Sequence, residues 1–296
     1  MNNAKVEGNV RRAFGLLIVL GGANSVAVRI SSLELAPFWG AAVRFMPSAL
    51  IFWAVLFWKG IPVPRGKALE GAMLYGVLTG FYYGLFYYGL VGVEAGLATV
   101  LLAITPLLTF FIAVMRGQEI FHWRGLFGGL ISLAGVYLSV GGGLAGGTGL
   151  NYLAAVIGSG LILAIGTVLY KSYPQNHPLV TNSIALSMAL VILLLTSWLL
   201  HEPWVLPQLR QTWLALAFII PIGTVVVFFT YFYILDRWSA SATSYSFLLF
   251  PFTATLFSAW LTGEEITGSF LLGGALVLLG VWVGVLSQEK LSRADI

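Results

Sequence analysis

The chain has 296 residues, of which 59% are hydrophobic and 9% are charged, whereas roughly a quarter of an ordinary soluble domain is charged. So few charges cannot cover a surface in water. We therefore exclude a soluble enzyme, a disordered chain and a nucleic-acid-binding protein, and we expect a lipid bilayer as the partner. The chain has no cysteine, which excludes disulfides, thiolate metal sites and cysteine nucleophiles. The formal net charge of +4 is informative only through the loops that carry it.

Ten apolar stretches, each long enough to cross a bilayer, follow one another along the chain. A hydrocarbon core about 30 Å thick requires about 20 apolar residues per helix. The stretches cover residues 12–30, 37–58, 68–90, 94–115, 124–142, 150–170, 178–200, 211–235, 240–262 and 268–287. We therefore predict an all-α integral membrane protein with ten transmembrane helices.

Basic residues concentrate in alternate connections between these stretches. With the N-terminus in the cytoplasm, 12 lysines and arginines fall on the inner side and only Arg29 and Arg210 fall outside, with Arg44 left inside the second stretch. This bias predicts that both termini are cytoplasmic. The first stretch also fits a signal peptide with a cleavage site at residues 25–27. Its removal would leave nine spans, so we expect that it is retained.

The sequence contains an internal repeat with an offset of 145 residues. The offset pairs Pro106 with Pro251, Glu119 with Glu264, Thr79 with Thr224, Gly128 with Gly273, and Gly135 with Gly280. We predict one repeat at residues 1–142 and a second at residues 150–296, joined by a flexible glycine-rich linker at residues 143–149. Because each repeat has five spans, an odd number, the two must cross the membrane in opposite senses, as in many secondary transporters.

The chain resembles the EamA-type exporters of the drug/metabolite transporter superfamily over nearly its whole length. The matching positions are Ala42, Val43, Arg44 and Phe45, then Gly117, Gln118 and Glu119 after Pro106, and Gly263, Glu264, Glu265, Ile266 and Thr267 after Pro251. The resemblance implies two inverted five-helix repeats that export small metabolites, amino acids or drug-like compounds through a central cavity. Within the family the chain is most similar in aromatic content to exporters of aromatic and other neutral amino acids.

Two prolines lie near the middle of equivalent spans, Pro106 in the fourth and Pro251 in the ninth. Proline lacks an N–H and clashes with the preceding turn, so it kinks a helix and leaves a carbonyl without its usual partner. We predict that both kinks act as gates beside a wet cavity. The alternative is a packing kink that a neighbouring helix satisfies.

The third span carries polar aromatic residues along one face. Four of its side chains recur at three- and four-residue spacings and are predicted to bind substrate, namely Tyr75, Thr79, Tyr82 and Tyr83. An adjacent stripe of Gly76, Gly80 and Gly84 lets another helix approach, which turns this face inward. Thr224 and Tyr231 of the eighth span lie at comparable depth and are included. Tyrosine also fills ordinary helix-bundle cores, and that alternative remains open.

Five further side chains supply hydrogen-bonding groups at similar depth and complete the predicted substrate site. They are Asn24, Thr99, Thr167, Ser244 and Tyr245. Thr99 precedes Pro106, and Ser244 precedes Pro251, by seven residues, which places each pair on one helix face. Each hydroxyl can instead bond to the backbone of its own helix.

Arg44 is the one charge well inside a span. A charge within a membrane is by default a functional residue that needs a partner. Glu94, Glu264 and Glu265 are the candidate partners near the outer surface. We favour a structural arginine that extends outward to the interface over one that contacts substrate.

The chemistry of the chain points to a carrier without a cofactor or metal. No reactive constellation is visible, and no carboxylate or histidine falls at the middle of the membrane, so we expect downhill, gradient-driven transport. We predict a bacterial inner-membrane exporter that binds a small-molecule substrate, an aromatic or other neutral amino acid first and a lipophilic cation second. A channel is the alternative of another class. The sequence gives no oligomeric state.

Overall fold

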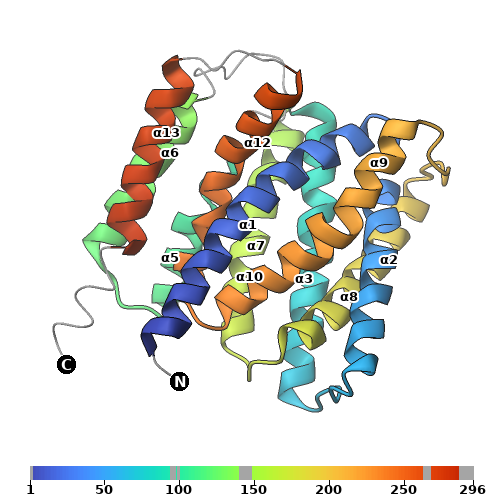
Figure 1. The fold of residues 1–296 in the computed structure, drawn as a ribbon, viewed down its shortest axis with the longest axis horizontal. Helices are drawn as coiled ribbons and strands as arrows, with labels where there is room; N and C mark the ends of the chain where they lie inside the picture. The colour runs from blue at the N-terminus through green and yellow to red at the C-terminus, as the bar shows by residue number, and fades with distance from the viewer. Residues whose placement is uncertain (1–2, 94–97, 99–100, 140–148, 263–267, 287–296) are drawn as a thin grey trace.

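A computed structural model describes residues 3–93, 98, 101–139, 149–262 and 268–286, and all regular secondary structure in these ranges is helical (Figure 1). The first half contains α1 (Asn3–Ser32), α2 (Pro37–Trp58), α3 (Lys67–Gly92), α5 (Thr105–Met115) and α6 (Trp123–Ser139). The second half begins with α7 (Leu150–Lys171) and α8 (Pro178–Leu199). It continues with α9 (Arg210–Phe218), the π-helix η1 (Ile219–Val226), α10 (Val227–Leu235), α11 (Ala240–Ser244), α12 (Ser246–Thr262), α13 (Gly268–Val281) and the π-helix η2 (Trp282–Leu286).

These helices form ten passes, which confirms the predicted all-α membrane fold. Within the described ranges, five helices are long and apolar enough to cross a bilayer, namely Val6–Ser32, Pro37–Trp58, Leu150–Lys171, Pro178–Leu199 and Arg210–Leu235. Large apolar side chains are exposed on the outside of the bundle, among them Leu50, Leu161, Leu195, Trp260 and Leu278. Such a surface is stable against lipid tails and not in water.

Four of the described spans depart from continuous α-helix, and the tenth does so by ending in the π-helix η2. The fourth is interrupted at Ala103 and Ile104, and Pro106 occupies the first turn of α5. Proline is tolerated there because the first N–H groups of a helix have no intrahelical partner. We expected Pro106 to kink the middle of a continuous helix, and the structure shows instead that it begins one. Pro251 does lie inside α12, and the ninth span breaks before it, at Tyr245. The eighth span instead relaxes into η1 around Pro221.

The contact between α6 and α13 shows the symmetry of the two halves. A Cβ built on Gly128 would lie 2.6 Å from the carbonyl oxygen of Gly280, and one on Gly135 would lie 2.6 Å from that of Gly273. The 145-residue offset exchanges these two contacts with each other. Early residues of α6 thus meet late residues of α13, so the helices are antiparallel, as inverted repeats require (Figure 1).

A self-paired contact lies at the centre of this helix pair. Ser132 Oγ donates to the carbonyl oxygen of Val277 at 3.4 Å, and these two positions are themselves separated by the repeat offset. In a two-fold arrangement, a residue that contacts its own equivalent lies next to the axis. The pseudo-two-fold axis therefore passes close to Ser132 and Val277.

The glycine stripe of α3 packs against another helix, α8, as predicted. A Cβ on Gly76 would lie 2.7 Å from Ala185 Cα, and one on Gly80 would lie 3.1 Å from Ala189 Cα. Gly84 differs, because a Cβ added there would meet only the Phe38 ring of α2, at 3.5 Å. The close approach on one side of α3 directs its tyrosine face toward the interior of the bundle.

The helices begin and finish at two opposite ends of the molecule, and these two ends differ in charge. The end at which α1 begins and α2 terminates is here named the basic end, and it carries Arg11, Arg12, Lys59, Arg65, Lys67, Arg116, Arg124, Lys171 and Arg237. The opposite end carries Arg29 and Arg210. The described parts of the first and last passes start and finish at the basic end (Figure 1). Because basic residues favour the cytoplasmic side of a membrane, we predict that the basic end faces the cytoplasm.

Candidate functional site

A cavity of about 420 Å³ lies between the two halves. Its walls come from α1, α2, α3, α7, α10 and α12, with Leu102 of the fourth span. It begins at the level of Leu17 and Tyr75 and extends to Ser32, Leu33 and Val93, which lie at the ends of α1 and α3 away from the basic end. This volume is sufficient for a small organic molecule.

The predicted face of α3 forms one wall of the cavity. Tyr75, Thr79, Tyr82 and Tyr83 all line it. The rings of Tyr82 and Tyr83 lie 4.6 Å apart, and the Tyr83 ring meets the edge of Phe45 at 4.9 Å. Aromatic rings that pack against one another in this way form a preorganised surface for a flat or apolar ligand.

Three more of the predicted residues reach the cavity from other helices, namely Asn24 of α1, Tyr231 of α10 and Pro251 of α12. Thr167 of α7 lies behind this wall, where its Oγ1 and the Tyr231 hydroxyl are 3.0 Å apart. Thr167 also donates to the carbonyl oxygen of Leu163 within its own helix. The structure therefore places Thr167 where it orients Tyr231 and not where it lines the cavity.

Four predicted site residues lie away from the cavity. Ser244 Oγ donates to the carbonyl oxygen of Ser241, and the Tyr245 hydroxyl donates to that of Gly125 at 3.1 Å. Pro106 is buried in the first turn of α5. Thr224, which the repeat offset pairs with Thr79, is buried in η1 and does not line the cavity. Thr99 lies outside the described residues, as do the linker at 143–148 and Glu94.

Sequence reasoning missed much of the aromatic wall opposite α3. Phe228 precedes Tyr231 by three residues, and Phe247, Phe250 and Ala254 follow one another at similar spacing on α12. This three- and four-residue periodicity is the signal that could have identified them. Arg44 also lines the cavity, although we expected a structural arginine that extends outward.

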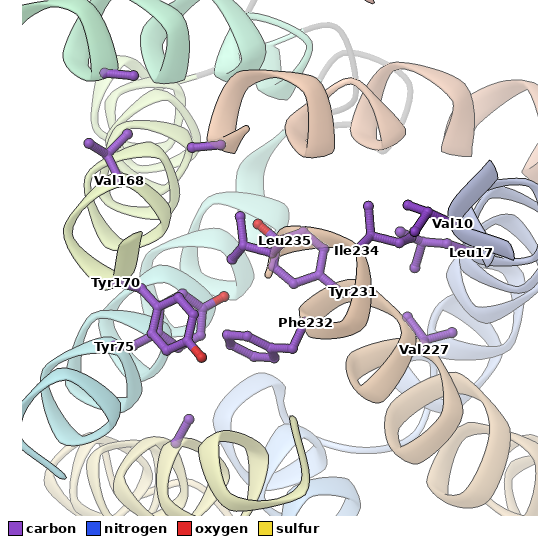
Figure 2. Packing of buried hydrophobic residues seen from close by; sticks show 13 residues of the cluster. Val10, Leu17, Tyr75, Val168, Tyr170, Val227, Tyr231, Phe232, Ile234 and Leu235 are labelled. Atoms are coloured by element: carbon purple, nitrogen blue, oxygen red, sulfur yellow. The ribbon is translucent and has the colours of Figure 1, made fainter. Parts of the chain in front are cut away.

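Aromatic side chains pack together at the basic end of the cavity, and Figure 2 shows Tyr75, Tyr170 and Phe232 close to one another. We name Tyr75, Tyr170 and Phe232 the floor. The Phe232 ring lies 5.0 Å from each of the two tyrosine rings, edge to face. The Tyr170 hydroxyl and Thr181 Oγ1 lie 2.9 Å apart, which fixes the Tyr170 ring. All three floor side chains are buried, so no open path leads from the cavity to the basic end through them.

Polar contacts join α7 to the end of α10 on the basic side of the floor. We name Lys171 and residues 235–238, which it contacts, the latch. Lys171 Nζ donates to the carbonyl oxygens of Leu235 at 2.7 Å and Trp238 at 3.1 Å. Asp236 lies between these two acceptors in the chain, and its Oδ1 has no hydrogen-bond partner among the described residues. Burial raises the pKa of Asp236 to about 6, against the opposing positive charges of Lys171 and Arg237. The latch therefore contains a carboxyl group that can titrate in the physiological range.

The comparison with known proteins covers both halves. The EamA-like transporter family matches residues 13–141 and again residues 150–286. The uncharacterized inner membrane transporter YedA of Escherichia coli strain K12 is 26% identical over 283 residues, which cover 90% of this chain and 90% of the relative. A probable amino-acid metabolite efflux pump of Salmonella typhimurium is 24% identical over 282 residues, which cover 91% of this chain and 92% of that pump.

A solved crystal structure supports the same architecture. It aligns with a TM-score of 0.77 at 20% identity and covers 94% of this chain and 98% of its own, which shows a shared fold. Two matches to one family, one in each half, account together for most of the sequence. The chain belongs to the EamA-like transporter family.

Proposed function

We propose that the chain exports small metabolites, aromatic or other neutral amino acids first, across the inner membrane by alternating access. Membership of a transporter family makes the chain a transporter and not an enzyme. The finer assignment depends on one observation, namely a cavity with an aromatic wall that is closed at the basic end and extends to the other end. Such a cavity is one of the two states that a pseudo-symmetric carrier exchanges.

The lining of the cavity supports a neutral or zwitterionic substrate. Of the described residues that line it, the charged ones are Arg29 and Arg44, and both are positive. The relative from Salmonella typhimurium is named a probable amino-acid metabolite efflux pump, and the one from Escherichia coli an inner membrane transporter. With the basic end in the cytoplasm, the cavity faces the outside, where an exporter releases its substrate.

The test is counterflow in proteoliposomes. Purified protein is reconstituted into vesicles loaded with unlabelled L-phenylalanine, and uptake of labelled L-phenylalanine is followed against empty liposomes. We expect a transient accumulation above equilibrium, because a carrier exchanges substrate across the bilayer. The same vesicles are then tested with leucine, a lipophilic cation and glucose. Failure of every amino acid to exchange would overturn the proposal.

A lipophilic cation is the second candidate, since tyrosine ring faces attract cations. The two arginines in the cavity act against it, because like charges repel in a medium of low dielectric constant. A channel is the third candidate and would give flux that does not saturate, without counterflow. The counterflow panel therefore separates all three.

A further inference from the structure

Arg44 lies in the second turn of α2, inside the membrane, and lines the cavity. Only 3% of its surface is exposed. A guanidinium group keeps its positive charge in proteins, so this position places a fixed cation in the wall of an otherwise apolar cavity. The low exposure contradicts our expectation of an arginine that extends outward to the interface.

Two nitrogens of the Arg44 guanidinium group have no hydrogen-bond partner among the described residues. Nε and Nη2 of Arg44 are buried, and neither makes a hydrogen bond within the described part of the chain. The carbon Cζ lies 4.7 Å from the centroid of the Phe45 ring and 5.2 Å from that of Tyr83. Ring faces attract the charge, but they do not replace the hydrogen bonds that water would provide. The arginine is thus held in place without an acceptor for two of its nitrogens.

A structural ion pair does not account for this arrangement in the described residues. Their one salt bridge, between Arg11 and Glu7, lies at the basic end. Glu94, Glu264 and Glu265, the partners that we considered from the sequence, lie outside the described residues. A buried charge without a carboxylate partner destabilises the fold, which is consistent with a residue retained for a ligand.

We infer that Arg44 binds the carboxylate of the substrate, so that the transported compounds carry one negatively charged carboxyl group next to an apolar body. A carboxylate accepts two parallel hydrogen bonds from a guanidinium group, and Nε with one Nη is a suitable donor pair. The apolar body then lies against the aromatic rings of Tyr83 and Phe228, which stack 6.3 Å apart. This inference rests on the proposed function and narrows its substrate class.

The experiment compares three ligands of similar shape in the counterflow assay. L-Phenylalanine carries a carboxylate and an ammonium group, 3-phenylpropionate carries only the carboxylate, and L-phenylalaninamide carries no negative charge. We expect the first two to compete with labelled L-phenylalanine and the amide to compete about tenfold less well or worse, since a charge-assisted hydrogen bond is lost. Equal competition by the amide would overturn the inference.

Three variants link this selectivity to Arg44. Arg44→Gln should lower phenylalanine counterflow by about tenfold or more, and Arg44→Lys should restore part of it, because lysine keeps the charge but not the paired donors. Arg210→Gln removes a positive charge at the same end of the molecule but outside the cavity, and it should behave as the parent. Parental counterflow and parental discrimination against the amide in Arg44→Gln would contradict the inference.

Thermal unfolding in detergent distinguishes binding from a structural role. Removal of an unpaired buried charge should leave the melting temperature of Arg44→Gln unchanged or higher. L-Phenylalanine should raise the melting temperature of the parent and of Arg210→Gln but not that of Arg44→Gln. A lower melting temperature in Arg44→Gln, with ligand stabilisation retained, would assign Arg44 to structure.

Failure of the inference differs from failure of the proposed function. If the parent exchanges phenylalanine and its amide equally well, amino-acid transport stands and the role of Arg44 falls. If the parent exchanges none of the amino acids, the proposed function falls, and the inference falls with it.

Discussion

Single glycines set the distance between helices in this bundle. At Gly76 an added Cβ would meet backbone atoms of Ala185, its Cα at 2.7 Å and its oxygen at 2.8 Å, and backbone cannot rotate away as a side chain can. At Gly84, eight residues later on the same helix, the nearest atom belongs to the Phe38 ring at 3.5 Å. Of these two glycines, only Gly76 is required for the close packing of α3 against α8.

We expect Gly76→Ala to destabilise the protein by about 1–3 kcal/mol, as overpacking does in other cores. Thermal unfolding in detergent measures the effect. Gly84→Ala is the matched control and should be neutral or slightly stabilising, because alanine is the better helix former. Equal stability of the two variants would show that α3 and α8 do not pack as closely as described.

The tyrosines of α3 should determine transport because they form a wall of the cavity. We expect Tyr82→Ala and Tyr83→Ala each to reduce phenylalanine counterflow by about tenfold, since a contact between two aromatic rings contributes roughly a kcal/mol beyond the burial of their surface. Tyr137→Ala, on an exposed face of α6 outside the cavity, is the control and should keep parental transport. Folded, inserted Tyr82 and Tyr83 variants that move every candidate at the parental rate would refute this role.

At the scale of elements, the latch between α7 and the end of α10 makes stability depend on pH. Burial raises the pKa of Asp236 to about 6 in the folded protein, whereas an aspartate in an unfolded chain titrates near about 4. The folded state therefore binds this proton more tightly. The resulting stability is fully present below about pH 4 and is lost as the pH rises to about 6.

We expect the melting temperature of the parent to fall by a few degrees between pH 4 and pH 7 relative to Asp236→Asn, which removes the titrating group. Glu70→Gln, at an exposed position in the first turn of α3, is the control and should follow the parent. Identical pH profiles of the parent and Asp236→Asn would show that the carboxyl group is not held in a buried position.

Helix positions followed from the sequence where hydrophobicity alone decides them. The ranges of α2 and α8 match the predicted spans to within one residue, because prolines begin both helices and apolar residues continue to the other end. The break before α5 and the π-helix η1 were not predicted. They depend on where the carbonyls freed by Pro106 and Pro221 find partners, and neighbouring helices decide that.

Prediction of the site was also limited because the partners of polar groups depend on neighbouring helices. The α3 face emerged because its spacing is regular and its glycines show which side is packed. Thr224 was assigned to the cavity because the repeat offset pairs it with Thr79, but the π-helix η1 holds it in a buried position outside the cavity lining. Thr167, Ser244 and Tyr245 have polar groups at a suitable depth, but each bonds to nearby protein atoms, and sequence does not reveal such local pairing.

At the scale of the whole molecule, the symmetry of the fold and the asymmetry of the cavity together indicate a cycle. The contact of α6 with α13 relates the halves by a two-fold axis, yet the floor closes only one end. In a carrier of inverted repeats, the second state has the same contacts with the roles of the halves exchanged. In that state the floor residues would separate to open the basic end, and the opposite end would close.

Access from one side at a time is the prediction that tests this cycle. The chain has no cysteine, so single cysteines can be introduced without removing others. Ser25 is exposed and lines the cavity, whereas Ser172 is exposed at the basic end, below the floor. We expect a membrane-impermeant maleimide to label Ser25→Cys from the outside of intact cells and Ser172→Cys only in inside-out vesicles.

Substrate should change only one of these reactions. Saturating L-phenylalanine should slow the labelling of Ser25→Cys, because it occupies the cavity, and should leave that of Ser172→Cys unaltered, because Ser172 does not line the cavity. Labelling of Ser25→Cys from the inside and not from the outside would contradict the prediction, because it would show that the cavity opens toward the basic end. Labelling of Ser172→Cys from the outside would instead place the basic end outside the cell and reverse the direction of export that the charge distribution predicts.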